Sequence, residues 1–187
     1  GLGAACGFRI FVPLLVASIA IHGGFLTVTP EFAWLGGTPA LITLSIATLL
    51  EIAGYYLPVI DNTLDVLGAP AAVIAGTILA AGFIGHMDPM LQWGLAAIAG
   101  GGAAGVIHGG MAAIRAAASA TTGGLGNSAV STAETVSASL VSILACVLPV
   151  LAVLLLGAAI YLLVRFAISL KRKLAQAGTP DKVEVQD

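Results

Sequence analysis

The chain has 187 residues, of which 59% are hydrophobic and 9% are charged, and its net charge is −2. A soluble domain carries roughly 25% charged residues to cover its core with a wetted surface, so this composition excludes an aqueous globular protein, a disordered chain and a disulfide scaffold. The small net charge gives no basic field, and no nucleic-acid partner is expected. The composition predicts an all-α integral membrane protein.

Five stretches approach the roughly 20 apolar residues that a helix needs to cross a bilayer. They lie at residues 3–21, 38–57, 69–84 and 90–117, and within the run 140–170. The first contains Arg9 and Pro13, and a short amphipathic segment at residues 59–67 precedes the third. We therefore expect a small polytopic helix bundle of about five spans.

The sequence leaves room for one or two half-helices or re-entrant segments in this bundle, and three places are candidates. The fourth stretch is long enough to be either tilted or broken, and Gly100–Gly102 are the expected place of a break. Residues 121–139 are rich in Ser, Thr and Gly but carry apolar residues at helical spacing, which predicts a half-helix with Glu134 on its polar face. Pro149 interrupts the last run, which is either one kinked helix or a short segment followed by a full span.

A basic cluster, Lys171-Arg172-Lys173, ends the last apolar run. Cytoplasmic loops carry an excess of Lys and Arg, so this cluster favours a cytoplasmic C-terminus. The expected organisation is a polytopic transmembrane domain over residues 1–170 and a polar tail over residues 171–187.

Glu51 lies inside the second predicted span, where an ionised side chain costs about 2.5–3.5 kcal/mol at the midplane on insertion scales. Thr48 precedes it by three residues and Tyr55 follows it by four, so the three share a helical face. Such a polar stripe is expected to line a cavity or a seam between helices. Glu51 is either functional or a structural partner of an arginine such as Arg9 or Arg115.

Asp61 and Asp65 follow Pro58 at a spacing that puts both carboxylates on one helical face. Two such carboxylates could take up a cation, share a proton or meet a basic group. The alternative is a solvated turn beside the membrane, although the surrounding apolar residues weaken that interpretation. The sequence predicts no cofactor and leaves a metal open.

His108 and Arg115 lie seven residues apart on nearly the same face of one predicted helix. Gly101, Gly105 and Gly109 form a tandem GxxxG motif on that helix. Small residues at this spacing let helices approach closely. Packing, including a homo-oligomer through these faces, is the leading interpretation, and a binding element beside His108 is the alternative.

A weak hint of internal duplication is also present. The segments 3–9 and 102–108 each place a basic residue at the same offset after Gly-Ala-Ala. Transporters are commonly built from inverted repeats whose broken helices meet near the midplane. Chance explains this low-complexity match about as well.

The order of these features resembles a family of bacterial membrane proteins grouped as domain of unknown function 4126. The features are the Gly-Phe-Arg-x-Phe-x-Pro start, Glu51, the segment 57–65 with its two aspartates, the His108…Arg115 helix and the segment 127–134. The resemblance covers the chain up to about residue 170. It implies one polar assembly of Arg9, Glu51, Asp61, Asp65, Arg115 and Glu134, but no established activity.

Two functions of different classes remain open from the sequence. The first is a small transporter or channel-like protein for a solute or ion, with a carboxylate-lined intramembrane site of Glu51, Asp61, Asp65, Arg9, His108, Arg115 and Glu134. With more acids than bases up to Leu170, a cation or proton is favoured over an anion. The second is a non-transporting scaffold or lipid-binding protein whose buried charges are structural ion pairs. Membrane lipids are expected partners, and a bacterial inner membrane is the expected location. Enzymatic activity is not expected, because the common catalytic motifs are absent.

Overall fold

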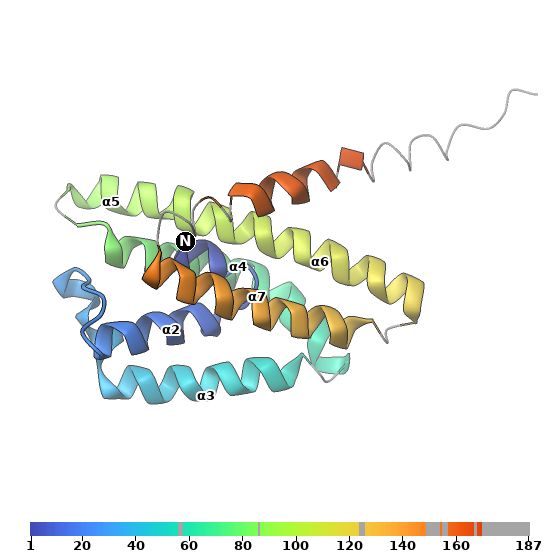
Figure 1. The fold of residues 1–187 in the computed structure, drawn as a ribbon, viewed down its shortest axis with the longest axis horizontal. Coiled ribbons are helices and arrows are strands. Elements are labelled where there is room, and N and C mark those ends of the chain that lie inside the picture. The colour runs from blue at the N-terminus through green and yellow to red at the C-terminus, as the bar shows by residue number, and fades with distance from the viewer. Residues whose placement is uncertain are drawn as a thin grey trace, which may run out of the picture.

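The computed structural model describes residues 1–55, 58–85, 87–123, 126–148, 154, 157–166 and 168–169, and for residues 58–66 it describes the backbone alone. Every regular element among these residues is a helix, which confirms the expected all-α architecture. In Figure 1 the long helices lie side by side, and the chain's N-terminal segment lies in the interior of the bundle.

The first apolar run is not the single span that was expected over residues 3–21. It forms two helices, α1 (Leu2–Ala5) and α2 (Phe11–His22), joined by a non-helical link. The run is divided because a distant side chain caps the second helix. Glu51 accepts hydrogen bonds from the backbone N–H groups of Ile10 and Phe11, so a new helix begins there. Pro13 lies in the first turn of α2, where its missing N–H is not needed.

The second predicted span is α3 (Thr38–Gly54), which is preceded by a 3₁₀ helix, η1 (Pro30–Gly36), at an angle of 61°. Its outward side is apolar, with Ile42, Ile46, Leu49 and Leu50 exposed. Its inward side carries Thr48 and Glu51, and Tyr55 follows as the C-cap. The predicted polar stripe therefore points into the bundle.

Residues 59–67 and 69–84 were expected to be separate elements, but one helix, α4 (Pro58–Phe83), contains both. Pro70 lies inside this helix. A proline removes one helical hydrogen bond, and membrane-type helices tolerate it because neighbouring helices and local adjustments satisfy the freed groups.

Of the two alternatives for the fourth stretch, one continuous helix is found, and Gly100–Gly102 do not break it but lie in a π-helical segment. The chain stays helical from Pro89 to Thr122 as α5 (Pro89–Ala96), a π-helical segment η2 (Ala97–Gly102) and α6 (Ala103–Thr122). These glycines allow the backbones of η2 and α4 to approach each other closely. A Cβ at Gly100 would lie 2.3 Å from the carbonyl oxygen of Gly76 on α4, and a Cβ at Gly3 would lie 2.6 Å from the same oxygen.

The predicted GxxxG motif is used within the chain. A Cβ at Gly101 would lie 2.4 Å from Thr77 Oγ1, and one at Gly105 would lie 3.1 Å from Val73 Cγ2, both on α4. Nothing among the described residues lies within 4 Å of a Cβ at Gly109. The packing interpretation of Gly101 and Gly105 is therefore correct, while a homo-oligomer stays a prediction.

A left-handed turn at Gly123 (φ 62°) ends α6, and the chain returns as α7 (Asn127–Val147). This one helix replaces both the half-helix expected over residues 121–139 and the start of the run 140–170. Leu148 is non-helical, so α7 ends just before Pro149, and a further apolar helix covers Gly157–Phe166. The segments 3–9 and 102–108 also differ, since only the second is continuously helical.

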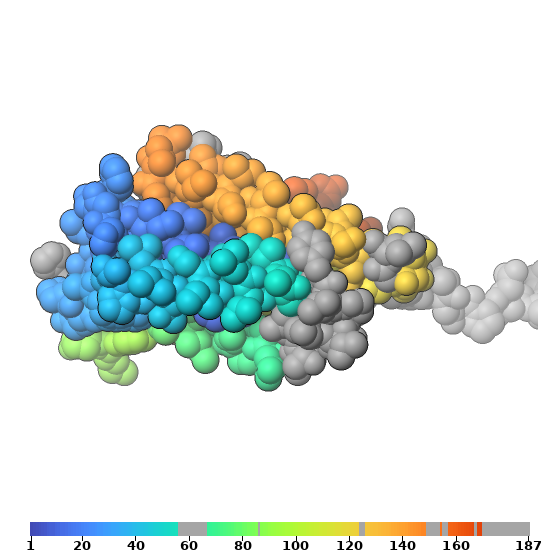
Figure 2. All heavy atoms as spheres, turned by 90° about the horizontal axis from the view of Figure 1, so that it is seen from below, coloured from blue at the N-terminus to red at the C-terminus, as the bar shows by residue number. Residues whose placement is uncertain are grey.

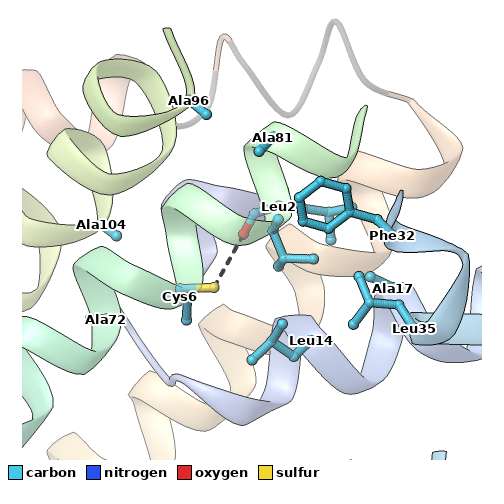
Figure 3. Close-up of a cluster of buried hydrophobic side chains, with 12 residues drawn as sticks. Leu2, Cys6, Leu14, Ala17, Phe32, Leu35, Ala72, Ala81, Ala96 and Ala104 are labelled. Atoms are coloured by element: carbon cyan, nitrogen blue, oxygen red, sulfur yellow. Dashed lines mark hydrogen bonds between the residues drawn. The ribbon is translucent and has the colours of Figure 1, made fainter. Parts of the chain in front are cut away.

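A compact apolar core lies where α1, α2, η1 and α4 meet. Figure 3 shows Phe32 and Leu35 of η1 beside Leu2, Leu14 and Ala17. The hydroxyl of Ser18 donates to the carbonyl oxygen of Leu35 at 2.5 Å and fixes η1 against α2. This core fills one end of the bundle and leaves the polar residues together elsewhere.

The distribution of side chains is the reverse of that in a soluble protein. On α7 the large exposed side chains Val136, Leu140, Ile143 and Val147 are apolar, while three of its four buried residues, Ser131, Glu134 and Ser142, are polar. Figure 2 shows α3, whose large exposed side chains are also apolar, spread across one face of the molecule. An apolar exterior around a polar interior is what a bilayer requires of a helix bundle.

Two helices of the described part of the chain, Pro89–Thr122 and Asn127–Val147, are long and apolar enough to cross a membrane. The bent pair of η1 and α3 makes a third if it counts as one span. The expected number of five spans is therefore not confirmed. The first run is broken, and within the described residues the apolar helices Leu67–Phe83 and Gly157–Phe166 are shorter than a span.

Candidate functional site

Arg9 lies in the link between α1 and α2 and is 1% exposed. Its side chain reaches α7, where Nε donates to Thr135 Oγ1 at 3.1 Å and Nη2 donates to the Ser131 carbonyl oxygen at 2.9 Å. Nη2 also donates to the Ser131 hydroxyl oxygen. The break between α1 and α2 is thus the place from which an arginine enters the interior.

Glu134 on α7 lies between two arginines and is fully buried. Arg115 on α6 directs Nη1 to both carboxylate oxygens, each at 2.6 Å. Arg9 Nη2 lies 3.7 Å from Glu134 Oε2. We call Arg9, Glu134 and Arg115 the buried charge cluster. Charged hydrogen bonds of this kind are short and strong, and burial removes the screening by water that weakens surface pairs.

Tyr55 connects the two arginines from the side of α3. The Cζ atom of Arg9 lies 3.8 Å from the centroid of the Tyr55 ring, and that of Arg115 lies 5.1 Å from it. Both distances are within the range of a cation–π interaction, which is worth about 2 kcal/mol or more when desolvated. Sequence reasoning placed Tyr55 on the polar stripe but did not predict that it contacts both arginines.

The sequence suggested an arginine as a structural partner of Glu51, whereas backbone N–H groups donate the hydrogen bonds that its carboxylate accepts. Its Oε1 accepts from Ile10 N–H at 2.7 Å and its Oε2 accepts from Phe11 N–H at 3.0 Å. These are the first N–H groups of α2, which have no partner within their own helix. A carboxylate at a helix N-terminus also opposes the positive end of the helix dipole. Glu51 thus joins α3 to α2 and compensates its own charge largely with backbone.

His108 on α6 is buried and lies against α4 beside Tyr55. A Cβ at Gly68 would lie 2.8 Å from His108 Cε1 and 3.7 Å from Tyr55 Oη. Gly68 therefore makes the room in which the imidazole and the phenol hydroxyl approach the α4 backbone.

Asp61 and Asp65 lie in the first turns of α4, but their side chains fall outside the described residues. The structure thus brings together Arg9, Glu134, Arg115 and Tyr55, with Glu51 and His108 next to them, and leaves the two aspartates as a prediction. The described residues contain no group of three His, Cys, Asp or Glu side chains that could hold a metal ion.

Ser131 and Thr135 are the site residues that sequence reasoning did not select. Ser131 lies three residues before Glu134 and therefore on the same helical face, and this spacing is the signal that could have identified it. Thr135 carries a weaker signal, because the other threonine of α7, Thr132, is exposed. Both hydroxyls orient the Arg9 guanidinium.

A groove of about 520 Å³ lies next to the cluster, between the start of α2, the end of α3 and α4. Its walls are almost entirely apolar, with Ile10, Phe11, Leu50 and Leu67 among them. The polar side chains in its described lining are Glu51 and Tyr55. Tyr55 therefore both lines the groove and contacts Arg9, which is not part of the groove wall.

An all-helical fold with membrane-span-like helices, an apolar exterior and a buried charge cluster defines the class of helical membrane-type proteins. Within that class the chain belongs to the family described as domain of unknown function (DUF4126), whose model matches residues 1–169. The resemblance predicted from the sequence is thus confirmed. No curated protein and no solved structure matches the chain.

Proposed function

We propose that the protein is a small membrane transporter or channel-like protein that moves a small solute or ion through its polar interior. The observation that carries this proposal is the buried charge cluster inside a bundle with an apolar surface. Ionisable residues in such a position face cavities or solute pathways by default in membrane proteins. Glu51, Glu134 and the two arginines are the residues assigned to the pathway.

The energetics support a functional reason for these charges. Four ionised groups within a membrane interior would together be destabilising by roughly 10 kcal/mol on insertion scales before any pairing. Replacing a buried ion network by well-packed apolar residues is often neutral or stabilising. Stability alone is therefore a weak reason for the presence of Arg9, Glu134 and Arg115, and a solute that meets them gives a stronger one.

The test is flux in liposomes that contain the purified protein. Na⁺, K⁺ and proton movements are followed with ion-sensitive dyes, and chloride and nitrate by osmotic response. We expect flux of at least one of these ions above protein-free liposomes, with a loss in Glu134→Gln. Glu31→Gln is the matched control, because Glu31 is an exposed glutamate of η1. Equal permeability of liposomes with and without the protein, across the whole panel, would contradict the proposal.

A second candidate is a membrane scaffold or lipid-binding protein, in which the charges are structural. The observation that favours this candidate is that the cluster is shut off from the surface. Its three members are at most 3% exposed, and they bind one another or α7. The combined variant Arg9→Met, Glu134→Leu and Arg115→Met separates the two candidates. A transporter should stay folded and lose flux, whereas a scaffold should lose its fold or its assembly.

The location in a bacterial inner membrane, the cytoplasmic C-terminus and a homo-oligomer belong to this proposal. The basic cluster at residues 171–173 supports the orientation through the positive-inside rule. That cluster lies outside the described residues. Fusing a reporter to the C-terminus that is active on only one side of the membrane would test it.

A further inference from the structure

The apolar groove between α2, α3 and α4 has a carboxylate in its wall. Its volume of about 520 Å³ is within the roughly 300–1,000 Å³ that is usual for small-molecule sites in proteins. Its described lining is apolar apart from Glu51 and Tyr55. Small-molecule sites are commonly built in this way, with apolar walls that hold the ligand and a few polar groups that orient it.

The groove opens on the apolar outer side of the bundle. Leu50 on α3 and Leu67 on α4 belong to its lining and are 68% and 61% exposed. Arg9 does not belong to the lining, so the groove is separate from the guanidinium group of the buried charge cluster. An occupant of the groove therefore comes from the bilayer, and walls of this composition favour a hydrocarbon chain over water.

The carboxylate of Glu51 has capacity for further hydrogen bonds. A carboxylate offers about four lone-pair positions, and those of Glu51 accept from two donors, Ile10 N–H and Phe11 N–H. Among the residues that the structure describes, no third donor reaches this carboxylate. A hydrogen bond to a charged acceptor is stronger than a neutral one, and exclusion of water strengthens it further. A ligand that brings a donor to Glu51 is therefore held more tightly than its hydrocarbon chain alone.

The surroundings of Glu51 favour a neutral donor over a cation. Its two N–H partners lie at the positive end of the α2 dipole, and the positive charge of Arg9 acts on the same carboxylate. A second cation would be repelled by Arg9 and would lose its hydration in an apolar groove. A hydroxyl group supplies the additional hydrogen bond without bringing a charge.

We propose that the groove binds a neutral lipid that carries a hydroxyl group, in its simplest form a long-chain alcohol. The chain lies along the apolar walls, and the hydroxyl donates to Glu51. The inference goes beyond the proposed function, because this ligand enters from the bilayer and its binding does not require transport through the polar interior.

Thermal unfolding of the purified protein in one detergent tests the binding, with each ligand expressed as its mole fraction in the micelles. Hexadecanol is the probe. Hexadecane and hexadecyl methyl ether are its matched controls, because both keep the chain and lack the donor. We expect a saturable rise of the unfolding temperature with hexadecanol, on the order of 5 °C at about 100 times the dissociation constant. Both controls should bind at least about tenfold more weakly.

The series of ligands decides the chemistry of the site. The absence of a saturable rise with hexadecanol would overturn the inference, and so would equal dissociation constants for hexadecanol and its methyl ether. Hexadecylamine is the cationic comparison, because a primary amine is protonated at neutral pH. Tighter binding of the amine than of the alcohol would show a cation site and would overturn the neutral ligand.

Variants of the wall locate the ligand. Ala71 lines the groove on α4, and Ala71→Leu places a larger apolar side chain there. This variant should stay folded, because it fills apolar space, and it should lose the response to hexadecanol. Ala113→Leu is the matched control and should keep the response, because Ala113 is an exposed alanine of α6 outside the groove lining. A response that persists in Ala71→Leu would place the ligand elsewhere and overturn the inference.

Glu51→Gln tests the acceptor. A neutral amide forms a hydrogen bond about half as strong as that of a carboxylate, so the preference for hexadecanol over its methyl ether should fall from about tenfold to about threefold or less. Glu31→Gln should leave the preference unchanged. An unchanged preference in Glu51→Gln would overturn Glu51 as the acceptor. If Glu51→Gln does not fold, Ala71→Leu and the series of ligands still decide the outcome.

Discussion

Replacing Glu51 by alanine should destabilise the protein through the backbone of α2. The change leaves the part-buried N–H groups of Ile10 and Phe11 without the carboxylate oxygens that accept from them at 2.7 and 3.0 Å. A buried donor that loses its acceptor costs roughly 1–3 kcal/mol, more when the acceptor was charged. This energy already includes the loss of the helix cap. Two such donors give about 2–6 kcal/mol for Glu51→Ala.

The amide of Glu51→Gln offers one acceptor oxygen in place of two, so about half of this loss is expected. For a chain of this size each kcal/mol lowers the unfolding temperature by roughly 2–4 °C. The expected order is therefore native, then Glu51→Gln, then Glu51→Ala, with a total decrease of at least about 4 °C.

The assay is thermal unfolding in detergent, followed by circular dichroism at a single protein concentration. Glu31→Ala is the control, since it removes an exposed glutamate from η1. An unfolding temperature of Glu51→Ala equal to that of Glu31→Ala would refute the assignment of Glu51 as the N-terminal partner of α2. A larger decrease for Glu51→Gln than for Glu51→Ala would refute it as well.

Two further substitutions have clear expected outcomes. Gly100→Ala should destabilise the protein by about 1–3 kcal/mol through overpacking, because its Cβ would lie 2.3 Å from the Gly76 carbonyl oxygen. Gly102→Ala is the control, because a Cβ at Gly102 would have its nearest contact at 3.7 Å. This control variant should be neutral or stabilising. Comparison of the two unfolding temperatures decides this, and equal losses would contradict the glycine junction. Tyr55→Leu should remove both arginine–ring contacts and lower the free energy of unfolding by roughly 1–4 kcal/mol. Tyr55→Phe keeps the ring over Arg9 and should therefore be more stable than Tyr55→Leu. Equal stability of the leucine and phenylalanine variants would show that the ring contributes nothing measurable.

The class of the protein could be predicted from the sequence because composition alone decides it. Too few charges to cover a soluble surface leave a membrane bundle, and the period of polar residues on α3 places Glu51 and Tyr55 inside. Arg9 and Arg115 could be singled out because charges are rare in apolar runs, whereas the family resemblance implied that Glu134 belongs to the same polar assembly.

The helix boundaries could not be predicted, because distant residues determine them. The first run breaks where Glu51, some 40 residues later, captures the N–H groups of α2. The glycine triplet stays helical because α4 packs against it, and no local signal in Gly100–Gly102 distinguishes close packing from a break. Which arginine meets which glutamate depends on the arrangement of α2, α6 and α7 in space.

The attachment of Arg9 to α7 has a consequence for the synthesis of the chain. Arg9 and its acceptor Ser131 are separated by 122 residues. At roughly 5–20 residues per second, Ser131 emerges about 6–24 s after Arg9. During that interval the arginine has no interior partner from α7, and its burial in hydrocarbon would be unfavourable by about 2.5–3.5 kcal/mol on insertion scales. The N-terminal segment must therefore wait near the membrane surface or within the insertion machinery, so that the last helices to be made complete the placement of the first.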